Sequence, residues 1–411
     1  MAERFQAPRG TFDVLPADAA AHERLLAQAG DLLGRAGYGR IDTPAFEDTE
    51  LFARGVGGST DIVRKEMFTF SDQGGRSLTL RPEGTASIAR AYLEHGMQKL
   101  PQPVKLWWYG WAFRHERPQA GRFRQFTQLD AEAIGSDSPL VDAELIMLLH
   151  ELLRGLEVPA LSLRLGSLGS WEARAEYREE LAAHLRRHED RLDEDVRERI
   201  DENPLRAFDS KHEGTRAVMA EAPTMLERLE GDDAEHFATV RRLLEHAGIA
   251  YELYGTLVRG LDYYTRTVFE FHCGALGAQS QVAGGGRYDG LIELLGGPAT
   301  PACGWAVGVE RILLALEGEP TPRPPDVFVA AADDQRERAL ALAAELRHAG
   351  LRAELDLGGR GLKGQMRHAD RLGVPNTVIL DEAGTVQLRD MSSGEQREVE
   401  VAELVEELVA G

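Results

Sequence analysis

Residues 105–134 hold the feature that most constrains the fold, because they combine two strand-like segments with a short basic loop. The first segment is an aromatic run at residues 106–113, and the second covers residues 124–134. The loop between them contains proline and glycine, which favour a turn. This pattern predicts an antiparallel β-hairpin.

The second segment of the hairpin places Phe126, Gln128 and Glu132 on one face, because strand side chains alternate with a period of two. Positive charge gathers around the loop, at Arg114, Arg117, Arg122 and Arg124. Planar guanidinium groups bind phosphate oxygens in pairs. An aromatic ring, an amide and a carboxylate beside these arginines suit a small polar ligand that carries phosphates. An exposed hairpin with solvated arginines is the purely structural alternative.

The bulk composition is typical of a globular protein of two or three domains. Of 411 residues, 43% are hydrophobic and 28% are charged. The net charge of -21 argues against a general nucleic-acid binder, because nonspecific binding depends on neutralising phosphates. It leaves room for a specific binder that uses local basic patches.

Features of the sequence predict a cytoplasmic protein that does not bind a membrane. No apolar run approaches the roughly 20 residues that a membrane span needs. The first residues, MAERFQAPRG, contain no apolar signal segment. Cys273 and Cys303 are too few for a disulfide framework and, without partners, for a zinc site.

Several motifs carry a family resemblance. FRHERPQ at residues 113–119, followed by GRFRQF at residues 121–126, resembles motif 2 of the class II aminoacyl-tRNA synthetases, in the form found in the histidyl enzymes. LVRGLDYYT at residues 257–265 is the most specific match and resembles the motif that separates the histidyl enzymes from other class II synthetases. AGGGRYDG at residues 283–290 resembles the glycine-rich floor of their histidine pocket, and GWAVGVER at residues 304–311 resembles motif 3.

A helix that ends at Gly37, followed by a strand predicted at residues 38–46 and interrupted at Pro44, resembles motif 1 of the same enzymes. Motif 1 forms the dimer interface in that family. The resemblance therefore implies a homodimer.

Glu83 and Thr85 precede a helix expected from about residue 86 to residue 93. A carboxylate and a hydroxyl at such positions commonly cap the helix. The resemblance implies instead that they hold the amino group of a substrate histidine, together with Gln128. An ammonium group needs several acceptors, and these three side chains supply them.

Changes in composition and in hydrophobic pattern along the chain predict the domain organisation. Residues 170–248 are dense in charged residues at helical spacing, which indicates a helical insertion. The Pro-rich residues 318–325 indicate a stiff linker. Alternating strand and helix patterns at residues 326–411 predict a small α/β domain that resembles the anticodon-binding domain of this synthetase group. The catalytic domain then comprises residues 1–169 and 249–317, an α+β fold on an antiparallel sheet with flanking helices.

The resemblance implies an enzyme that activates L-histidine with ATP and Mg²⁺ and transfers it to the 3′ end of tRNA(His). The implied catalytic residues are Arg114 and Arg259. The implied histidine ligands are Glu83, Thr85, Gln128, Glu132, Tyr263, Tyr264 and Tyr288. The implied ATP ligands are Arg114, Glu116, Arg122, Phe126 and Arg311. The implied tRNA contacts are Arg117, Gln119, Lys363, Arg367 and Arg371, and no side chain is implied as a metal ligand.

The implied ligands divide the substrates between them. Arg114 and Arg259 flank the α-phosphate, and Arg122 and Arg311 hold the outer phosphates. Phe126 stacks on adenine while Glu116 accepts from its amino group. Glu132 and Tyr264 grip the imidazole nitrogens. Two of these assignments have purely structural alternatives. Without the resemblance, Arg259, which precedes a glycine, would be an ordinary turn residue. Lys363, Arg367 and Arg371 would be the solvated face of a helix.

Two other functions fit parts of the sequence. Chains similar to the histidyl enzymes serve as regulatory subunits of ATP phosphoribosyltransferase, but these lack the anticodon-type domain and often lose aminoacylation residues. The predicted domain after Pro325 and the complete set Arg114, Arg259 and Arg311 disfavour that alternative. A plain RNA-binding module leaves the predicted histidine ligands unexplained.

Overall fold

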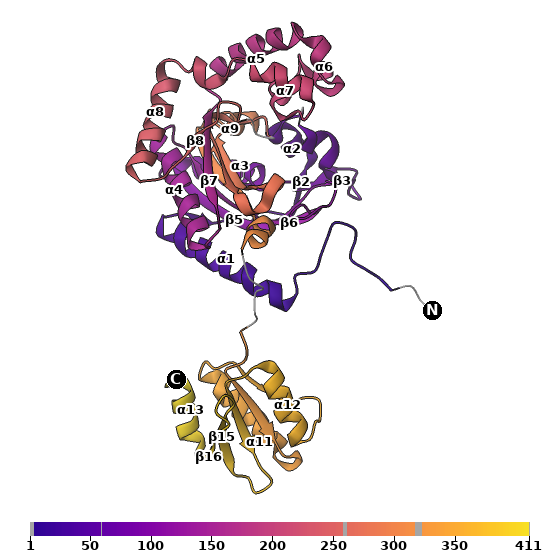
Figure 1. Ribbon diagram of the computed structural model, residues 1–411, viewed down its shortest axis with the longest axis vertical. Coiled ribbons are helices and arrows are strands. Elements are labelled where there is room, and N and C mark those ends of the chain that lie inside the picture. The colour runs from indigo at the N-terminus through magenta and orange to yellow at the C-terminus, as the bar shows by residue number, and fades with distance from the viewer. Residues whose placement is uncertain (1–3, 59, 258–260, 317–322, 411) are drawn as a thin grey trace. The chain divides into compact units, whose positions relative to one another are not determined.

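The computed structural model describes residues 4–58, 60–257, 261–316 and 323–410. The chain divides into two compact units, Met1–Pro320 and Thr321–Gly411. The first is coloured indigo to orange and the second orange to yellow in Figure 1. No helix in the described ranges is both long and apolar enough to cross a bilayer.

An eight-stranded sheet organises the first unit. Its strands run in the order β1 (Gly39–Arg40), β5 (Val104–Phe113), β6 (Gln125–Ile134), β11 (Ala302–Gly308), β10 (Gln281–Arg287), β9 (Thr265–Cys273), β7 (Leu161–Ser167) and β8 (Glu252–Leu253). All inner pairings are antiparallel, and only the pairings at the two edges are parallel. The predicted hairpin is confirmed as β5 and β6, and the predicted antiparallel α+β fold is confirmed with it.

The strand predicted at residues 38–46 is found only at its two ends, and the interruption predicted at Pro44 separates two strands of different sheets. The chain forms β1, leaves the main sheet, and joins a small antiparallel sheet as β2 (Phe46–Asp48), beside β4 (Ser77–Leu80) and β3 (Phe68–Ser71). Proline lacks an N–H for a strand ladder. The carbonyls of Thr43 and Pro44 instead accept hydrogen bonds from Arg81 Nη1 at 2.6 and 3.0 Å. This arginine anchors the crossing between the two sheets.

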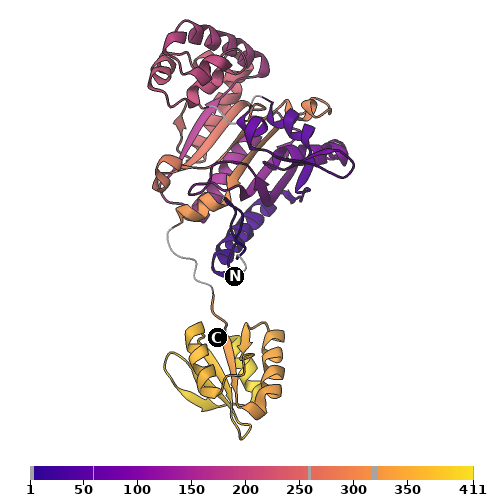
Figure 2. The ribbon, with the colours of Figure 1, turned by 90° about the vertical axis from the view of Figure 1, so that its right-hand side faces the viewer.

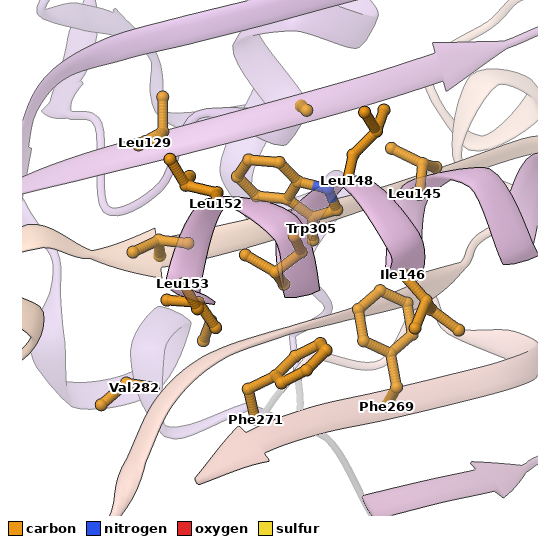
Figure 3. Packing of buried hydrophobic residues seen from close by; sticks show 14 of the residues in the cluster. Leu129, Leu145, Ile146, Leu148, Leu152, Leu153, Phe269, Phe271, Val282 and Trp305 are labelled. Carbon is orange, nitrogen blue, oxygen red and sulfur yellow. The ribbon is translucent and has the colours of Figure 1, made fainter. Parts of the chain in front are cut away.

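One face of the main sheet packs on four helices, α1 (Pro16–Arg35), α4 (Pro139–Gly155), α8 (Gly231–His246) and α10 (Val309–Ala315). Figure 3 shows Trp305 of β11 and Phe269 and Phe271 of β9 beside leucines of α4. Each buried side chain of this size stabilises the fold by roughly 1.5–3 kcal/mol. Ser138 caps α4 through the N–H of Leu140, and Pro139 begins the helix, a position that proline favours.

The opposite face carries a second buried cluster, and it contains three of the predicted histidine ligands, Tyr263, Tyr264 and Tyr288. Trp107 belongs to the first cluster and Trp108 to the second, because neighbouring strand residues point to opposite faces. Helices α3 (Thr85–Glu94) and α9 (Leu291–Leu294) pack on this second face. Helix α2 (Thr49–Val56) adds a smaller cluster beside α3.

The predicted helical insertion contains α5 (Trp171–Arg186), α6 (Glu194–Arg199) and α7 (Glu213–Ala220), which share a small core of their own. These three helices lie together at one end of the unit in Figures 1 and 2. Helix α8 differs from them, because Phe237, Val240 and Leu244 enter the main core beside α4. The last helix of the charged stretch therefore belongs to the packing of the main sheet.

The second unit is a five-stranded sheet covered by helices. The strand order is β13 (Ala353–Leu355), β12 (Val327–Ala331), β14 (Asn376–Leu380), β15 (Val386–Asp390) and β16 (Gln396–Glu398). The first two pairings are parallel and the others antiparallel. The helices are α11 (Arg336–His348), α12 (Leu362–Leu372) and α13 (Val401–Ala410). The predicted C-terminal α/β fold is confirmed, with mixed strands.

Candidate active site

A cavity of about 590 Å³ opens over β6, β9, β10 and β11 of the main sheet. It is lined in part by the loop between β5 and β6 and by the start of α10. Six of the predicted site residues lie in its wall: Arg114, Glu116, Arg122, Phe126, Gln128 and Arg311. The structure therefore brings together predicted ATP ligands that are far apart in the sequence. Arg311, for example, donates to the carbonyl of Gly121, which lies 190 residues earlier.

Two guanidinium groups flank the carboxylate of Glu116 in this cavity, and a third, that of Arg311, lies in the cavity wall. Arg122 Nη1 lies 3.4 Å from Glu116 Oε2, and Arg114 Nη1 lies 3.9 Å from Glu116 Oε1. Arg311 donates to the carbonyls of Gly121 and Gln281 at 3.1 and 2.9 Å. Burial, and then the nearby charge of Arg122, lowers the pKa of Arg311. Such an excess of positive charge favours a polyanion.

Phe126 extends from β6 into the same cavity. The guanidinium carbon of Arg114 lies 5.3 Å from the centre of its ring, which is the geometry of a cation–π contact. Arg114 Nε also donates to the carbonyl of Pro82 at 2.9 Å. The aromatic ring and the first cation of the predicted ATP site are thus adjacent.

Glu132, deeper on β6, is the centre of the buried polar cluster. Its Oε1 accepts from Thr85 Oγ1 at 2.7 Å, and its Oε2 accepts from the Tyr288 hydroxyl at 2.5 Å. Burial raises the pKa of Glu132 to about 8. Gly304 of β11 makes room for this carboxylate, since a Cβ there would lie 1.5 Å from Glu132 Oε2.

Glu83 acts as a helix cap in this structure. Its two carboxylate oxygens accept from the N–H groups of Thr85 and Ala86 at 2.7 and 2.8 Å, at the start of α3. Burial raises the pKa of Glu83. The helix cap proposed as the alternative role of Glu83 is therefore present. The carboxylate still has further lone pairs that can accept from a ligand.

Two tyrosines complete the buried cluster. The ring of Tyr263 lies 4.8 Å from that of Tyr264 and 5.5 Å from that of Tyr288, centre to centre. All the predicted histidine ligands therefore gather on one side of the sheet, with Gln128 in the cavity wall. Gln128 Oε1 is buried without a hydrogen-bond partner in the described part of the chain.

Asp130 is a buried neighbour of the predicted histidine ligands that the sequence reasoning did not single out. It lies between Gln128 and Glu132 on the same face of β6 and is fully buried. Neither carboxylate oxygen has a hydrogen-bond partner among the described residues. Burial, and then the neighbouring Glu132 and Glu83, raises the pKa of Asp130 well above its ordinary value. The only sequence signal for Asp130 is strand alternation. Asp130 lies two residues after Gln128 and two before Glu132, so all three side chains share one strand face.

The remaining predicted residues lie elsewhere. Arg259 falls outside the described residues. Arg117 and Gln119 are exposed in the β5–β6 loop. Lys363, Arg367 and Arg371 are exposed along α12 of the second unit. In the described ranges no cluster of three or more His, Cys, Asp or Glu side chains suits a metal ion.

Comparison with known proteins assigns the family. Residues 10–312 match the histidyl-tRNA synthetase family model, and residues 326–410 match the model of an anticodon-binding domain. The chain belongs to the histidyl-tRNA synthetase family. A relative named histidine--tRNA ligase, from Rubrobacter xylanophilus, is 50% identical over 409 residues, which cover 96% of each chain.

Solved structures of similar chains share the fold of this synthetase. The apo histidyl-tRNA synthetase of S. aureus is 36% identical, covers 99% of this chain and 100% of its own, and superposes with a TM-score of 0.83. A Bacillus halodurans chain, titled an ATP phosphoribosyltransferase regulatory subunit/histidyl-tRNA synthetase, is 22% identical with a TM-score of 0.69, covering 93% and 99% of the two chains. The second similarity concerns the fold alone.

Proposed function

We propose that this synthetase is a histidine--tRNA ligase, which forms histidyl-adenylate from L-histidine and ATP and transfers histidine to tRNA(His). One observation carries the proposal beyond family membership. Strand β6 presents Phe126 to an arginine-lined cavity and Glu132 to a buried tyrosine cluster. A phosphate-binding region and a small polar pocket thus adjoin each other on one strand.

In the first step an oxygen of the histidine carboxylate attacks the α-phosphorus of ATP. The bond from that phosphorus to the bridging oxygen breaks, and pyrophosphate leaves. Two anions must approach, so positive charge has to be in place beforehand. Arg114 and Arg259 supply it at the α-phosphate, while Arg122 and Arg311 bind the outer phosphates. Arg114 and Arg311 are already held by backbone carbonyls, so their positions need little adjustment.

Mg²⁺ fits this cavity as a companion of the phosphates. It usually binds one or two carboxylates together with substrate phosphates. The carboxylates of Glu270 and Glu310 lie in the cavity wall. Burial raises the pKa of Glu310, and a bound cation would favour its ionised form. The ion would neutralise part of the phosphate charge.

Histidine specificity arises in the Glu132 cluster. Glu132 and Tyr264 bind the imidazole nitrogens, and Glu83, Thr85 and Gln128 bind the ammonium group. A site built to pair with ring nitrogens rejects an analogue without them, because its own buried polar groups would be left unpaired. Tyr263 and Tyr288 close the sides of the pocket.

In the second step the 3′-terminal hydroxyl of tRNA(His) attacks the carbonyl carbon of the adenylate, and AMP leaves. Arg117 and Gln119 are exposed beside the cavity, where the acceptor end must enter. Lys363, Arg367 and Arg371 offer an exposed basic face on α12 for the anticodon arm. These contacts are local, which agrees with a chain whose net charge is -21.

A homodimer is the assembly that we propose. The small sheet that begins at the last residue of the motif 1-like segment exposes Phe46 by 48% and Phe70 by 43%, and their ring centres lie 6.0 Å apart. Exposed paired aromatic rings on a sheet face are typical of interfaces. Both cysteines are free and buried, which fits the cytoplasm as the site of action.

Pyrophosphate exchange tests the proposal. The full chain should catalyse histidine-dependent exchange of labelled pyrophosphate into ATP, and exchange should be absent with other amino acids. A regulatory subunit of ATP phosphoribosyltransferase would bind histidine without exchange, and that result would refute the ligase.

A further inference from the structure

Helix α5 reaches from the insertion to the tyrosine-bearing segment of the histidine pocket. Arg174, near the start of α5, is only 6% exposed. Its Nη1 donates to the carbonyl of Asp262 at 2.9 Å and to that of Tyr264 at 2.6 Å. The two carbonyls flank Tyr263, so a single nitrogen atom fixes the backbone on both sides of that residue.

The burial of this guanidinium group is costly. In the described ranges no carboxylate lies within ion-pair distance of Arg174, and its Nε has no hydrogen-bond partner. Burial lowers the pKa of Arg174 to about 10. The side chain also stacks near Trp171, with its guanidinium carbon 5.5 Å from the ring centre. A buried cation that serves two backbone carbonyls indicates that the position of those carbonyls matters.

Two more contacts hold the same segment. Asn203 Nδ2 donates to Asp262 Oδ1 at 3.1 Å. Arg266 has a φ of 45°, a left-handed conformation that side chains rarely adopt, and its Nε donates to Asp233 Oδ1 at 2.9 Å. Residues of the predicted 170–248 insertion therefore contact both ends of the segment that carries the two tyrosines.

The segment in turn packs against the centre of the pocket. The Tyr263 ring lies 5.5 Å from that of Tyr288, whose hydroxyl donates to Glu132. A shift of the Tyr263 backbone would consequently move the rings that surround the Glu132 carboxylate. Interiors are close-packed, so such a shift is transmitted rather than absorbed.

We propose that the helical insertion positions the histidine pocket, with Arg174 as the positioning residue that sets the backbone around Tyr263. The inference rests on the proposed function, because it concerns histidine binding at the same site. It gives the insertion a role in amino-acid activation that does not require tRNA.

Pyrophosphate exchange by full-length variants tests this role. Arg174→Met should raise the KM for histidine at least about tenfold, as expected for lost hydrogen bonds from a charged group, while the KM for ATP changes less than about twofold. Arg174→Lys should recover part of the loss, because an ammonium group can still donate to one carbonyl. Arg186→Met is the matched control. Arg186 is an exposed arginine of the same helix, paired with Asp201 inside the insertion, and its loss should leave both constants unchanged.

The melting temperature separates positioning from mere stability. A purely structural Arg174 predicts a lower melting temperature with an unchanged KM for histidine, and that result in folded Arg174→Met would overturn the inference. Should the Arg174 variants fail to fold, Asn203→Ala decides: a raised KM for histidine supports the inference and an unchanged one overturns it. Absence of exchange in the unsubstituted chain would refute the proposed function itself.

Discussion

At the scale of residues, the buried cluster around Glu132 supplies both the core contacts of the fold and the proposed histidine pocket. The carboxylate is fully enclosed and accepts from two hydroxyl groups, while burial holds its pKa near 8. Unfolded glutamate titrates near 4.3. The contribution of protonated Glu132 is therefore fully present below about pH 4.3 and is lost as the pH rises through about 8.

Glu132→Gln should accordingly change both stability and binding. The melting temperature of the unliganded variant should depend less on pH between 5 and 8 than that of the parent chain, because the substituted group does not ionise. Its histidine affinity should fall by an amount on the order of 1.5–3 kcal/mol, with ATP affinity little changed. Calorimetric titrations with each ligand check this. Unchanged histidine affinity would show that the carboxylate does not bind the substrate.

Arg259→His should slow adenylate formation by at least about a hundredfold, the loss typical of a contact that stabilises transition-state charge. Binding of histidine and ATP should change much less, because the contact strengthens as charge develops on phosphorus. Lysine should restore the rate only in part. Rapid-quench kinetics and thermal unfolding on the same preparation distinguish this role from that of a turn residue. A stable variant with a normal adenylation rate would contradict the assignment.

Sequence reasoning placed Phe126, Gln128 and Glu132 on one face of a strand because their spacing follows strand alternation, and the register of β6 confirms that placement. It did not single out Asp130, on the same face, because no motif drew attention to it. A buried acid without a donor is recognisable only when the surrounding residues are known. Helix capping by Glu83 was expected as an alternative, and the structure shows the carboxylate engaged in this way.

At the scale of elements, strand alternation and the turn residues predicted the β5–β6 hairpin well. The strand predicted at residues 38–46 forms only at its two ends because Pro44 diverts the chain toward Arg81, a partner far away in sequence. Strand β16 was not predicted, since all three of its residues are exposed and its side chains carry no hydrophobic alternation. The charge of α8 concealed an apolar stripe, Phe237, Val240 and Leu244, that joins the main core.

The C-terminal α/β domain allows the two reaction steps to be tested separately. Deleting residues 326–411 should leave histidyl-adenylate formation largely intact and severely reduce transfer to tRNA. No predicted activation residue lies in that range, and its hydrophobic clusters, such as that of Val329 and Leu342, are its own. Exchange and charging assays on the truncated chain measure the two steps separately. Near-normal charging would contradict an anticodon-binding role.

At the scale of the whole molecule, the exposed Phe46–Phe70 pair should lie in the interface of a homodimer. Stable interfaces generally bury more than about 1,000 Å² in total. Sedimentation at micromolar concentration should show a dimer, and Phe46→Glu with Phe70→Glu should shift it toward monomer. As a control, Leu340→Glu changes an exposed residue of α11 and should leave the dimer intact. A monomeric parent chain would contradict the proposed assembly.

Charging of tRNA(His) by the full-length chain tests the central claim most directly. Labelled histidine should become attached to the 3′ end of tRNA(His) in the presence of ATP and Mg²⁺, and no other amino acid should be attached. Omission of ATP should abolish the product, because transfer requires the adenylate. Failure to charge tRNA(His) with histidine, or equal charging with another amino acid, would contradict the assignment of this site to histidine--tRNA ligation.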